Sequence, residues 1–191
     1  DALGPRWCAV VARQAAVESD ASPWVHLRAH RAAPLDVLLA QSFDLLVVMD
    51  YEQYAVLRDR WPWKWHNRPR NVWVGATMEN QACAEERAGD LIEIPAMVHF
   101  ASVEPMIGRV DLSPWLSSID GRRGIDWAII GGESGGGHAE LDLVAAEELA
   151  DQCLDAGVAV FVKQDSGPQP GMRGRLSDKM WSLKQSPAVR S

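Results

Sequence analysis

The chain has 191 residues, of which 47% are hydrophobic and 24% are charged, so it can bury one sizeable core within a single domain. Its formal net charge of −7 argues against docking on a phosphate backbone over a broad surface, which needs an excess of Lys and Arg. The sequence contains no run of about 18 apolar residues that would span a bilayer, and its start lacks the layout of a secretory signal. Three widely spaced cysteines do not make a disulfide framework or a metal knuckle. These features favour a cytoplasmic protein without membrane contact.

From residue 44 onward, short apolar runs typical of buried strands alternate with helical patterns. Strands are expected at residues 45–49, 72–76, 98–101, 127–130 and 158–162, and helices at 51–60, 81–92 and 143–156. Asn80 suits the N-cap of the second helix, and Gly157 suits the end of the third. Right-handed crossovers repeated in this order predict an α/β fold, a partial (βα) barrel with mainly parallel strands, whose site lies at the carboxyl ends of the strands.

The two ends of the chain are less regular. Residues 1–43 contain a helical pattern at 7–17, a short strand pattern at 24–27 and a short helix at 35–41, and we expect this segment to cover an edge of the barrel formed by residues 44–164. Residues 165–191 are rich in Gly, Pro, Ser, Lys and Arg, and they predict an extended basic tail with one anchored turn at 176–183.

Polar residues follow the ends of four predicted strands, and these ends should meet at one rim. Carboxylates can accept hydrogen bonds from an ammonium group or from ribose hydroxyls, and backbone N–H groups of a glycine loop can hold a carboxylate or phosphate. The expected ligand-binding residues are Glu79, Glu104, Gly131, Gly132, Glu133, Ser134, Lys163 and Gln164.

Structural roles remain open for the same residues. Glu79 could instead cap the following helix, Glu104 could form a salt bridge, and Glu133 could pair with Lys163 across the barrel mouth. Lys163 could bind a ligand carboxylate or phosphate, or belong to an ion pair.

Two histidines and one acidic helix are candidates for catalysis or metal binding. His99 lies within a predicted strand and is expected to be a core histidine, whereas His138 follows the glycine loop and is the better acid–base candidate. The carboxylates of the helix near residues 144–154 are expected to form a solvated face and not a metal site. No hydrolase triad, Walker loop or dinucleotide fingerprint occurs in the sequence, so no catalytic residue is assigned.

A basic and aromatic patch precedes the second strand. Between residues 58 and 70, five Lys and Arg residues and one Asp give 5 − 1 = +4, interleaved with three tryptophans, and aromatic rings among cations suit stacked bases. An alternative function is therefore a non-catalytic module that contacts nucleic acid or a host protein through Trp61, Trp63, Lys64, Arg68 and Arg70. The same residues can instead have a purely structural role, in which the tryptophans cover the barrel edge and the arginines keep a loop hydrated.

Four motifs, spread over roughly residues 45 to 185, resemble those of a known protein family in their order along the chain and in their spacing. They are NVWVGATMENQ from residue 71, SVEPMIG from residue 102, WAIIGGESG from residue 127 and FVKQ from residue 161. In these motifs the chain resembles an uncharacterised phage protein family whose members look like diverged radical-SAM barrels. The resemblance implies a phage or prophage protein of the host cytoplasm, with a radical-SAM-like barrel that holds a SAM-like or nucleotide-like ligand at its strand ends.

The chain departs from that family at two places. Complete members open with a cysteine-rich segment ending in Cys-x-x-Cys-Tyr that suits a [4Fe–4S] cluster, but this chain has only Cys8 near its start, and one thiolate does not replace three. Residues 49–52, Met-Asp-Tyr-Glu, stand where the family has Thr-Lys-Arg-Pro. S-adenosylmethionine is therefore the candidate cofactor, without radical chemistry in this chain unless missing sequence or another chain supplies the cluster ligands.

Overall fold

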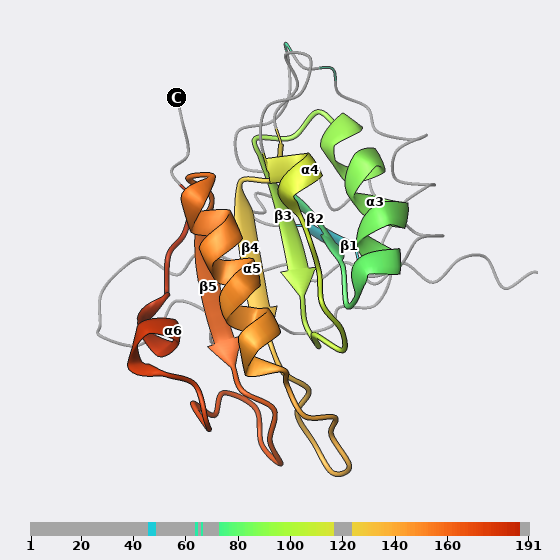
Figure 1. The fold of residues 1–191 in the computed structure, drawn as a ribbon. Helices are drawn as coiled ribbons and strands as arrows, with labels where there is room; N and C mark the ends of the chain where they lie inside the picture. Colours follow the sequence, from blue (N-terminus) through green and yellow to red (C-terminus); the bar gives the residue numbers. More distant parts are fainter. Residues whose placement is uncertain (1–45, 49–63, 65, 67–72, 117–123, 188–191) are drawn as a thin grey trace, which may run out of the picture.

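The structure is a computed structural model that describes residues 46–48, 64, 66, 73–116 and 124–187 (Figure 1). Five strands form one sheet: β1 (Leu46–Val48), β2 (Trp73–Thr77), β3 (Val98–Val103), β4 (Trp127–Gly131) and β5 (Ala159–Gln164). All neighbouring strands are parallel, and their order in the sheet is their order in the chain. A doubly wound sheet reverses its strand order, whereas a barrel wall does not. The expected α/β fold is confirmed, and this order is consistent with a partial (βα) barrel.

The helices are α3 (Gln81–Glu93), α4 (Ser113–Leu116), α5 (Leu143–Asp155) and α6 (Asp178–Ser182). Helices α3, α4 and α5 lie in the connections between strands and cover one face of the sheet (Figure 1). The Asn80 side chain accepts a hydrogen bond from Cys83 N at 3.0 Å, which confirms it as the N-cap of α3. Gly157 follows the C-cap residue Ala156 of α5 and has φ +72°, as expected of a helix-ending glycine.

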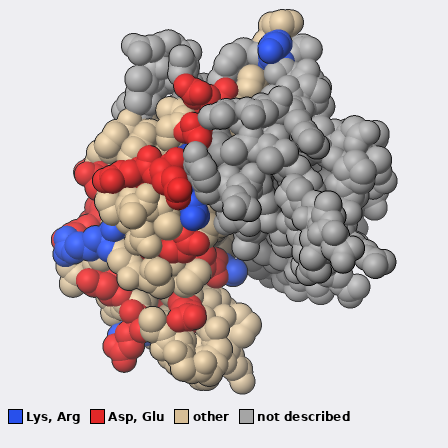
Figure 2. Space-filling view, turned by 90° about the vertical axis from the view of Figure 1, so that its right-hand side faces the viewer, with Lys and Arg blue, Asp and Glu red and all other residues tan. Residues whose placement is uncertain are grey.

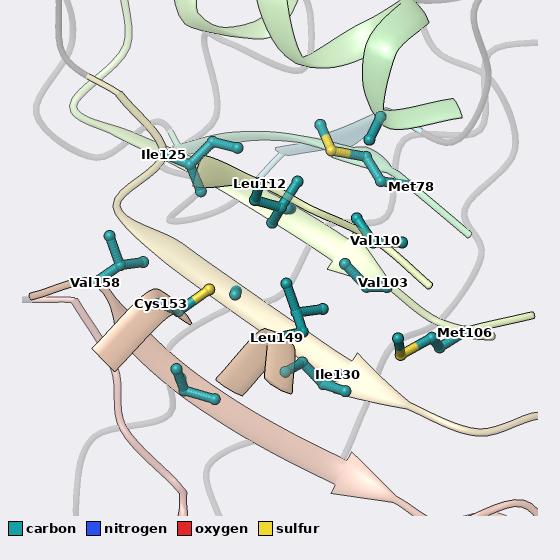
Figure 3. Close-up of a cluster of buried hydrophobic side chains, with 14 of the residues drawn as sticks. Met78, Val103, Met106, Val110, Leu112, Ile125, Ile130, Leu149, Cys153 and Val158 are labelled. Atoms are coloured by element: carbon teal, nitrogen blue, oxygen red, sulfur yellow. The ribbon is translucent and has the colours of Figure 1, made fainter. Parts of the chain in front are cut away.

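An apolar core fills the space between the sheet and these helices. Figure 3 shows strand residues Val103 and Ile130 facing Leu149 and Cys153 of α5, and all four side chains are buried. Leu112, from the connection after β3, is also fully buried in this cluster. Burial of this kind is the main stabilising contribution, at about 25 cal/mol per Å² of apolar surface removed from water.

Aromatic side chains occupy the opposite face of the sheet, near the amino ends of the strands. Trp127 of β4 is fully buried, and its ring centroid lies 5.8 Å from Phe100, 5.9 Å from Trp73 and 6.4 Å from Phe161. Its indole N–H donates to the carbonyl of Gln185 at 3.0 Å. We call this face the inner face, because the helices lie on the other one.

The segment after α6 runs antiparallel along the outer edge of β5. Val162 N donates to Leu183 O at 2.9 Å, and Gln185 N donates to Val160 O at 3.0 Å. Helix α6 itself falls within the turn expected at residues 176–183. The tail thus covers part of an edge that would otherwise expose unpaired backbone groups.

Several boundaries differ from the expectations. Strand β3 continues through Val103, and β5 continues through Gln164, past the positions where the first polar residues suggested an end. The short α4 was not expected. The helix expected at residues 51–60 and the elements expected at 7–17, 24–27 and 35–41 lie outside the described residues. In the part of the chain that the structure describes, no helix has the length and apolar character to cross a membrane.

Candidate functional site

The inner face is built of rows that run across the sheet. The strand register places Thr77, Ser102, Ile129 and Phe161 side by side in one row, with Gly75, Phe100, Trp127 and Ala159 in the row below. Because side chains alternate between faces along a strand, the next residues on this face, toward the carboxyl ends, are Glu104, Gly131 and Lys163. The inner face is therefore aromatic at its base and charged at its rim.

The rim row holds an ion pair. Lys163 Nζ lies 2.7 Å from Glu104 Oε1, and the two side chains are 39% and 16% exposed. They come from β5 and from the residue after β3, two strands apart, so about 9.6 Å of sheet separates their backbones. Gly131 of β4 stands between them, and a Cβ at this glycine would lie 3.2 Å from both Cγ and Cδ of Glu104. The missing side chain at Gly131 lets Glu104 cross the middle strand.

A bulge in β5 places two polar residues at this point. Ile130 pairs with Val162, but Gly131 pairs with Gln164, so Lys163 is the extra residue. Gln164 is 2% exposed; its Nε2 donates to Gly132 O at 2.8 Å, and its Oε1 accepts from Gly171 N at 2.8 Å. Lys163 and Gln164 were both expected to bind the ligand. Lys163 lies at the rim, whereas Gln164 connects the neighbouring loops.

Glu79 forms an ion pair on the helix side of the rim. Its Oε2 lies 3.2 Å from Arg87 Nη1, which also donates to Thr77 O at 2.7 Å. The helix cap is supplied by Asn80, so the capping role left open for Glu79 is wrong. Ile107 N donates to Glu79 O at 2.9 Å, which ties the loop after β3 to the end of β2.

Glu133 braces the glycine loop. Its Oε2 accepts a hydrogen bond from Ala139 N at 2.8 Å, closing a seven-residue loop, and the pairing of Glu133 with Lys163 is wrong because Lys163 reaches Glu104 instead. The Glu133 side chain is exposed. Among the described contacts, its second oxygen, Oε1, has no hydrogen bond.

The expected backbone cradle is partly closed. Gly132 N donates to Gln164 O at 3.1 Å, and a Cβ at Gly132 would lie 2.3 Å from Ser166 N, so the chain itself fills this position. Ser134 forms an isolated parallel bridge with Gly167. Open space remains around Gly136, where an added Cβ would meet no atom within 4 Å.

An ion pair that sequence reasoning missed lies just below this loop. Asp165 follows β5 and is 1% exposed, and its two oxygens accept from Nε and Nη2 of Arg175, each at 3.0 Å. Burial alone raises the pKa of Asp165, but the hydrogen bonds and charge of Arg175 outweigh it and hold the pKa below its usual range. The signal in the sequence was a carboxylate directly after a buried strand, but its cationic partner is ten residues away.

The histidines differ in their surroundings. His99 is fully buried and its Nε2 lies 2.7 Å from Ile94 O, which confirms a core role. His138 is half-buried, with Nδ1 2.8 Å from Gly135 O. Since a carbonyl only accepts, Nδ1 carries the proton and Nε2 is left as the acceptor in the neutral ring.

Acidic side chains are spread over the described part of one face of the molecule (Figure 2). On α5, Glu148 pairs with Arg109, and Asp151 pairs with Lys179 at 2.7 Å. Within the described residues, no three His, Cys, Asp or Glu side chains are placed to hold a metal ion. Two of the α5 carboxylates are therefore ion-paired at the exposed surface.

Neither of the two described cysteines, Cys83 and Cys153, lies at the rim. Cys153 is fully buried in the core, and burial raises its thiol pKa to about 12. Cys83 on α3 is half-buried; its pKa is raised by burial and by the neighbouring Glu79. Iron–sulfur clusters need thiolates, so these two residues do not fit as cluster ligands. Cys8 lies outside the described residues.

The basic and aromatic patch falls almost entirely outside the described residues. The structure does not describe Trp61, Trp63, Arg68 and Arg70. It describes Lys64, which is exposed. The nucleic-acid interpretation of the patch stays a prediction.

Comparison with known proteins identifies the family. Residues 30–181 match the model of a family described as protein of unknown function DUF5131. No curated protein and no solved structure matches the chain significantly. The match includes β2 to β5 and all the rim residues described above. The chain belongs to the DUF5131 family.

Proposed function

We propose that this protein is a radical-SAM-like barrel that binds a SAM-like or nucleotide-like small molecule at the carboxyl ends of its strands. The observation that carries the proposal is the Glu104–Lys163 pair, which crosses Gly131 on the inner face. Its phage or prophage origin and its radical-SAM relationship rest on the order and spacing of the sequence motifs.

The charges at the rim suit the amino-acid end of such a ligand. A free anion or a free cation would pull the pair apart and leave one partly buried charge without a partner. A zwitterion can place its ammonium against Glu104 and its carboxylate against Lys163, so every charge keeps an opposite neighbour. S-adenosylmethionine carries this zwitterion.

The loop that follows β4 supplies further polar groups on the same edge. The exposed Glu133 keeps its Oε1 free of hydrogen bonds among the described contacts, and a carboxylate oxygen accepts well from ribose hydroxyls. Glu133 therefore suits the nucleoside end of the ligand, and Glu104 with Lys163 suits the other end.

Radical chemistry is not part of the proposal for this chain. A [4Fe–4S] cluster needs several accessible thiolates, but Cys153 is enclosed in the core and Cys83 belongs to the helix layer. The proposed activity is binding, and a reaction would need ligands from sequence or a chain beyond the described residues.

Calorimetric titration of S-adenosylmethionine into the full chain tests this function. We expect binding by the wild type, a loss of about tenfold or more in affinity in Glu104→Gln, and a similar loss in Glu133→Ala. The matched control is Glu148→Gln, which removes the same charge from an exposed pair on α5 and should leave the affinity unchanged. An iron and sulfide assay after anaerobic reconstitution should detect no cluster. Absence of binding by the wild type, or full affinity in Glu104→Gln, contradicts the proposal.

A further inference from the structure

Two loops continue side by side beyond the carboxyl edge of the sheet (Figure 1). We call residues 132–141 and 165–176 the paired loops. Gly167 N donates to Glu133 O at 3.0 Å, Gly135 N donates to Gly167 O at 2.9 Å, and Leu141 N donates to Ser166 Oγ at 3.0 Å. These bonds extend the pairing of β4 and β5 past the sheet, so the paired loops form one structural unit.

Asp165 lies at the base of this unit, and its carboxylate is fully engaged. Both its oxygens are bound by the Arg175 guanidinium, and it also accepts from Arg175 N at 2.6 Å and from Ser166 N at 2.7 Å. Gly174 makes the approach possible: its φ is +51°, and a Cβ there would lie 2.4 Å from Asp165 Oδ2.

The guanidinium of Arg175 also contacts the other loop. Nη2 donates to Leu141 O and to Ser166 Oγ, each at 3.2 Å, and Nη1 lies 3.2 Å from Glu140 Oε2. The planar fork thus joins both paired loops at one point, which a point-charge ammonium does not reproduce.

We call the Asp165–Arg175 pair the clamp, and it is connected to both ends of the proposed ligand site. Asp165 is two residues after Lys163, and the intervening Gln164 is bonded to Gly132 and Gly171. Glu133 lies in the first of the paired loops. The Asp165 carboxylate is buried, whereas the Arg175 side chain is 45% exposed. An ion pair with a buried member contributes little net stability compared with apolar packing, but it can select a single conformation.

We propose that Arg175 is a positioning residue, which through Asp165 holds Lys163 and the Glu133 loop in the one arrangement that receives the ligand. The part of this inference that concerns the ligand rests on the function proposed above. The part that concerns the loops does not.

Amide hydrogen exchange on the full chain, with calorimetry at a temperature where every variant is fully folded, tests the proposal. In Arg175→Met we expect exchange at Gly135, Leu141 and Gly167 to rise about tenfold or more, and the dissociation constant for S-adenosylmethionine to rise by a similar factor. The matched control is Arg173→Met, which removes an exposed guanidinium that donates to Leu176 O and pairs with Asp178, so both quantities should stay within about twofold of wild type.

A purely structural role would lower the unfolding temperature without changing affinity in the folded protein. Arg175→Lys keeps the charge without the fork, and it should reproduce the exchange and affinity changes of Arg175→Met; it also replaces that variant if Arg175→Met does not fold. Unchanged exchange in the folded variant, or raised exchange with wild-type affinity, overturns the positioning role. Failure of the wild type to bind S-adenosylmethionine overturns only the proposed function, and the exchange result then decides the role of the clamp.

Discussion

The substitution Gly75→Ala tests the packing of the aromatic side chains on the inner face, where the Phe100 ring lies over Gly75. A Cβ at this position would lie 2.2, 2.3 and 2.4 Å from three ring carbons of Phe100, whereas ordinary contact begins at 3.4 Å, so the ring must move by more than 1 Å. Phe100 is 1% exposed and packs against Trp127, which is itself fully buried and hydrogen-bonded to Gln185. Overpacking of this kind costs about 1–3 kcal/mol, which for a chain of this length lowers the unfolding temperature by about 2–12 °C.

Chemical and thermal unfolding followed by circular dichroism measures this effect. The matched control is Gly89→Ala in α3, where the nearest atom to an added Cβ is Trp115 Nε1 at 4.0 Å, so the substitution should stabilise by about 0.4–1 kcal/mol. Replacing Phe100 by Leu in the Gly75→Ala background should recover part of the loss, because the contacting ring is removed. Wild-type stability of Gly75→Ala, or purely additive effects in the double variant, would refute the placement of Phe100 over Gly75.

Two further predictions concern titratable groups. Because Arg175 holds the folded-state pKa of Asp165 below the unfolded value, the pair's contribution is present above the ordinary carboxyl pKa and is lost as the pH falls through the folded-state value. The stability difference between wild type and Arg175→Met, measured by urea unfolding, should therefore narrow as the pH falls below about 4, and a constant difference would contradict this account. Burial of Cys153, with its pKa of about 12, predicts very slow alkylation by iodoacetamide at pH 8 in the native protein and rapid alkylation in urea. Site-resolved mass spectrometry checks it, and equal rates in the two states would show that the thiol is accessible.

The sequence allowed the alternation of strands and helices to be predicted because each element carries a local signal. Helix α3 differs from the expected range by one residue at its end, and its N-cap is a property of Asn80 and its immediate neighbours. The strand ends were less predictable. Lys163 suggested a break in β5, but its ammonium is paired with Glu104, so the strand continues through it.

The partners at the rim could not be read from the sequence, because they depend on which residues point to the same face. Glu133 follows β4, the strand next to β5, and this closeness favoured it as the partner of Lys163. Strand β4 ends at Gly131, and the chain then leaves the sheet. In the loop beyond it, the Glu133 carboxylate accepts a hydrogen bond from Ala139 N. Glu104 is one strand farther away, but it emerges on the inner face together with Lys163.

Gly131 and the β5 bulge therefore work together. Without the bulge, Gly131 would pair with Lys163, and Gln164 would alternate onto the helix-covered face. The loops would then lose the bonds of Gln164 to Gly132 and Gly171. Without the glycine, a side chain on β4 would occupy the path of Glu104 toward Lys163. The glycine leaves room for an acid and a base from separate strands to meet, and the bulge sets Gln164 opposite Gly131, where it joins the two loops. Gly131 is thus explained by the ion pair that it permits, and Gly132 by the close approach of the Ser166 backbone.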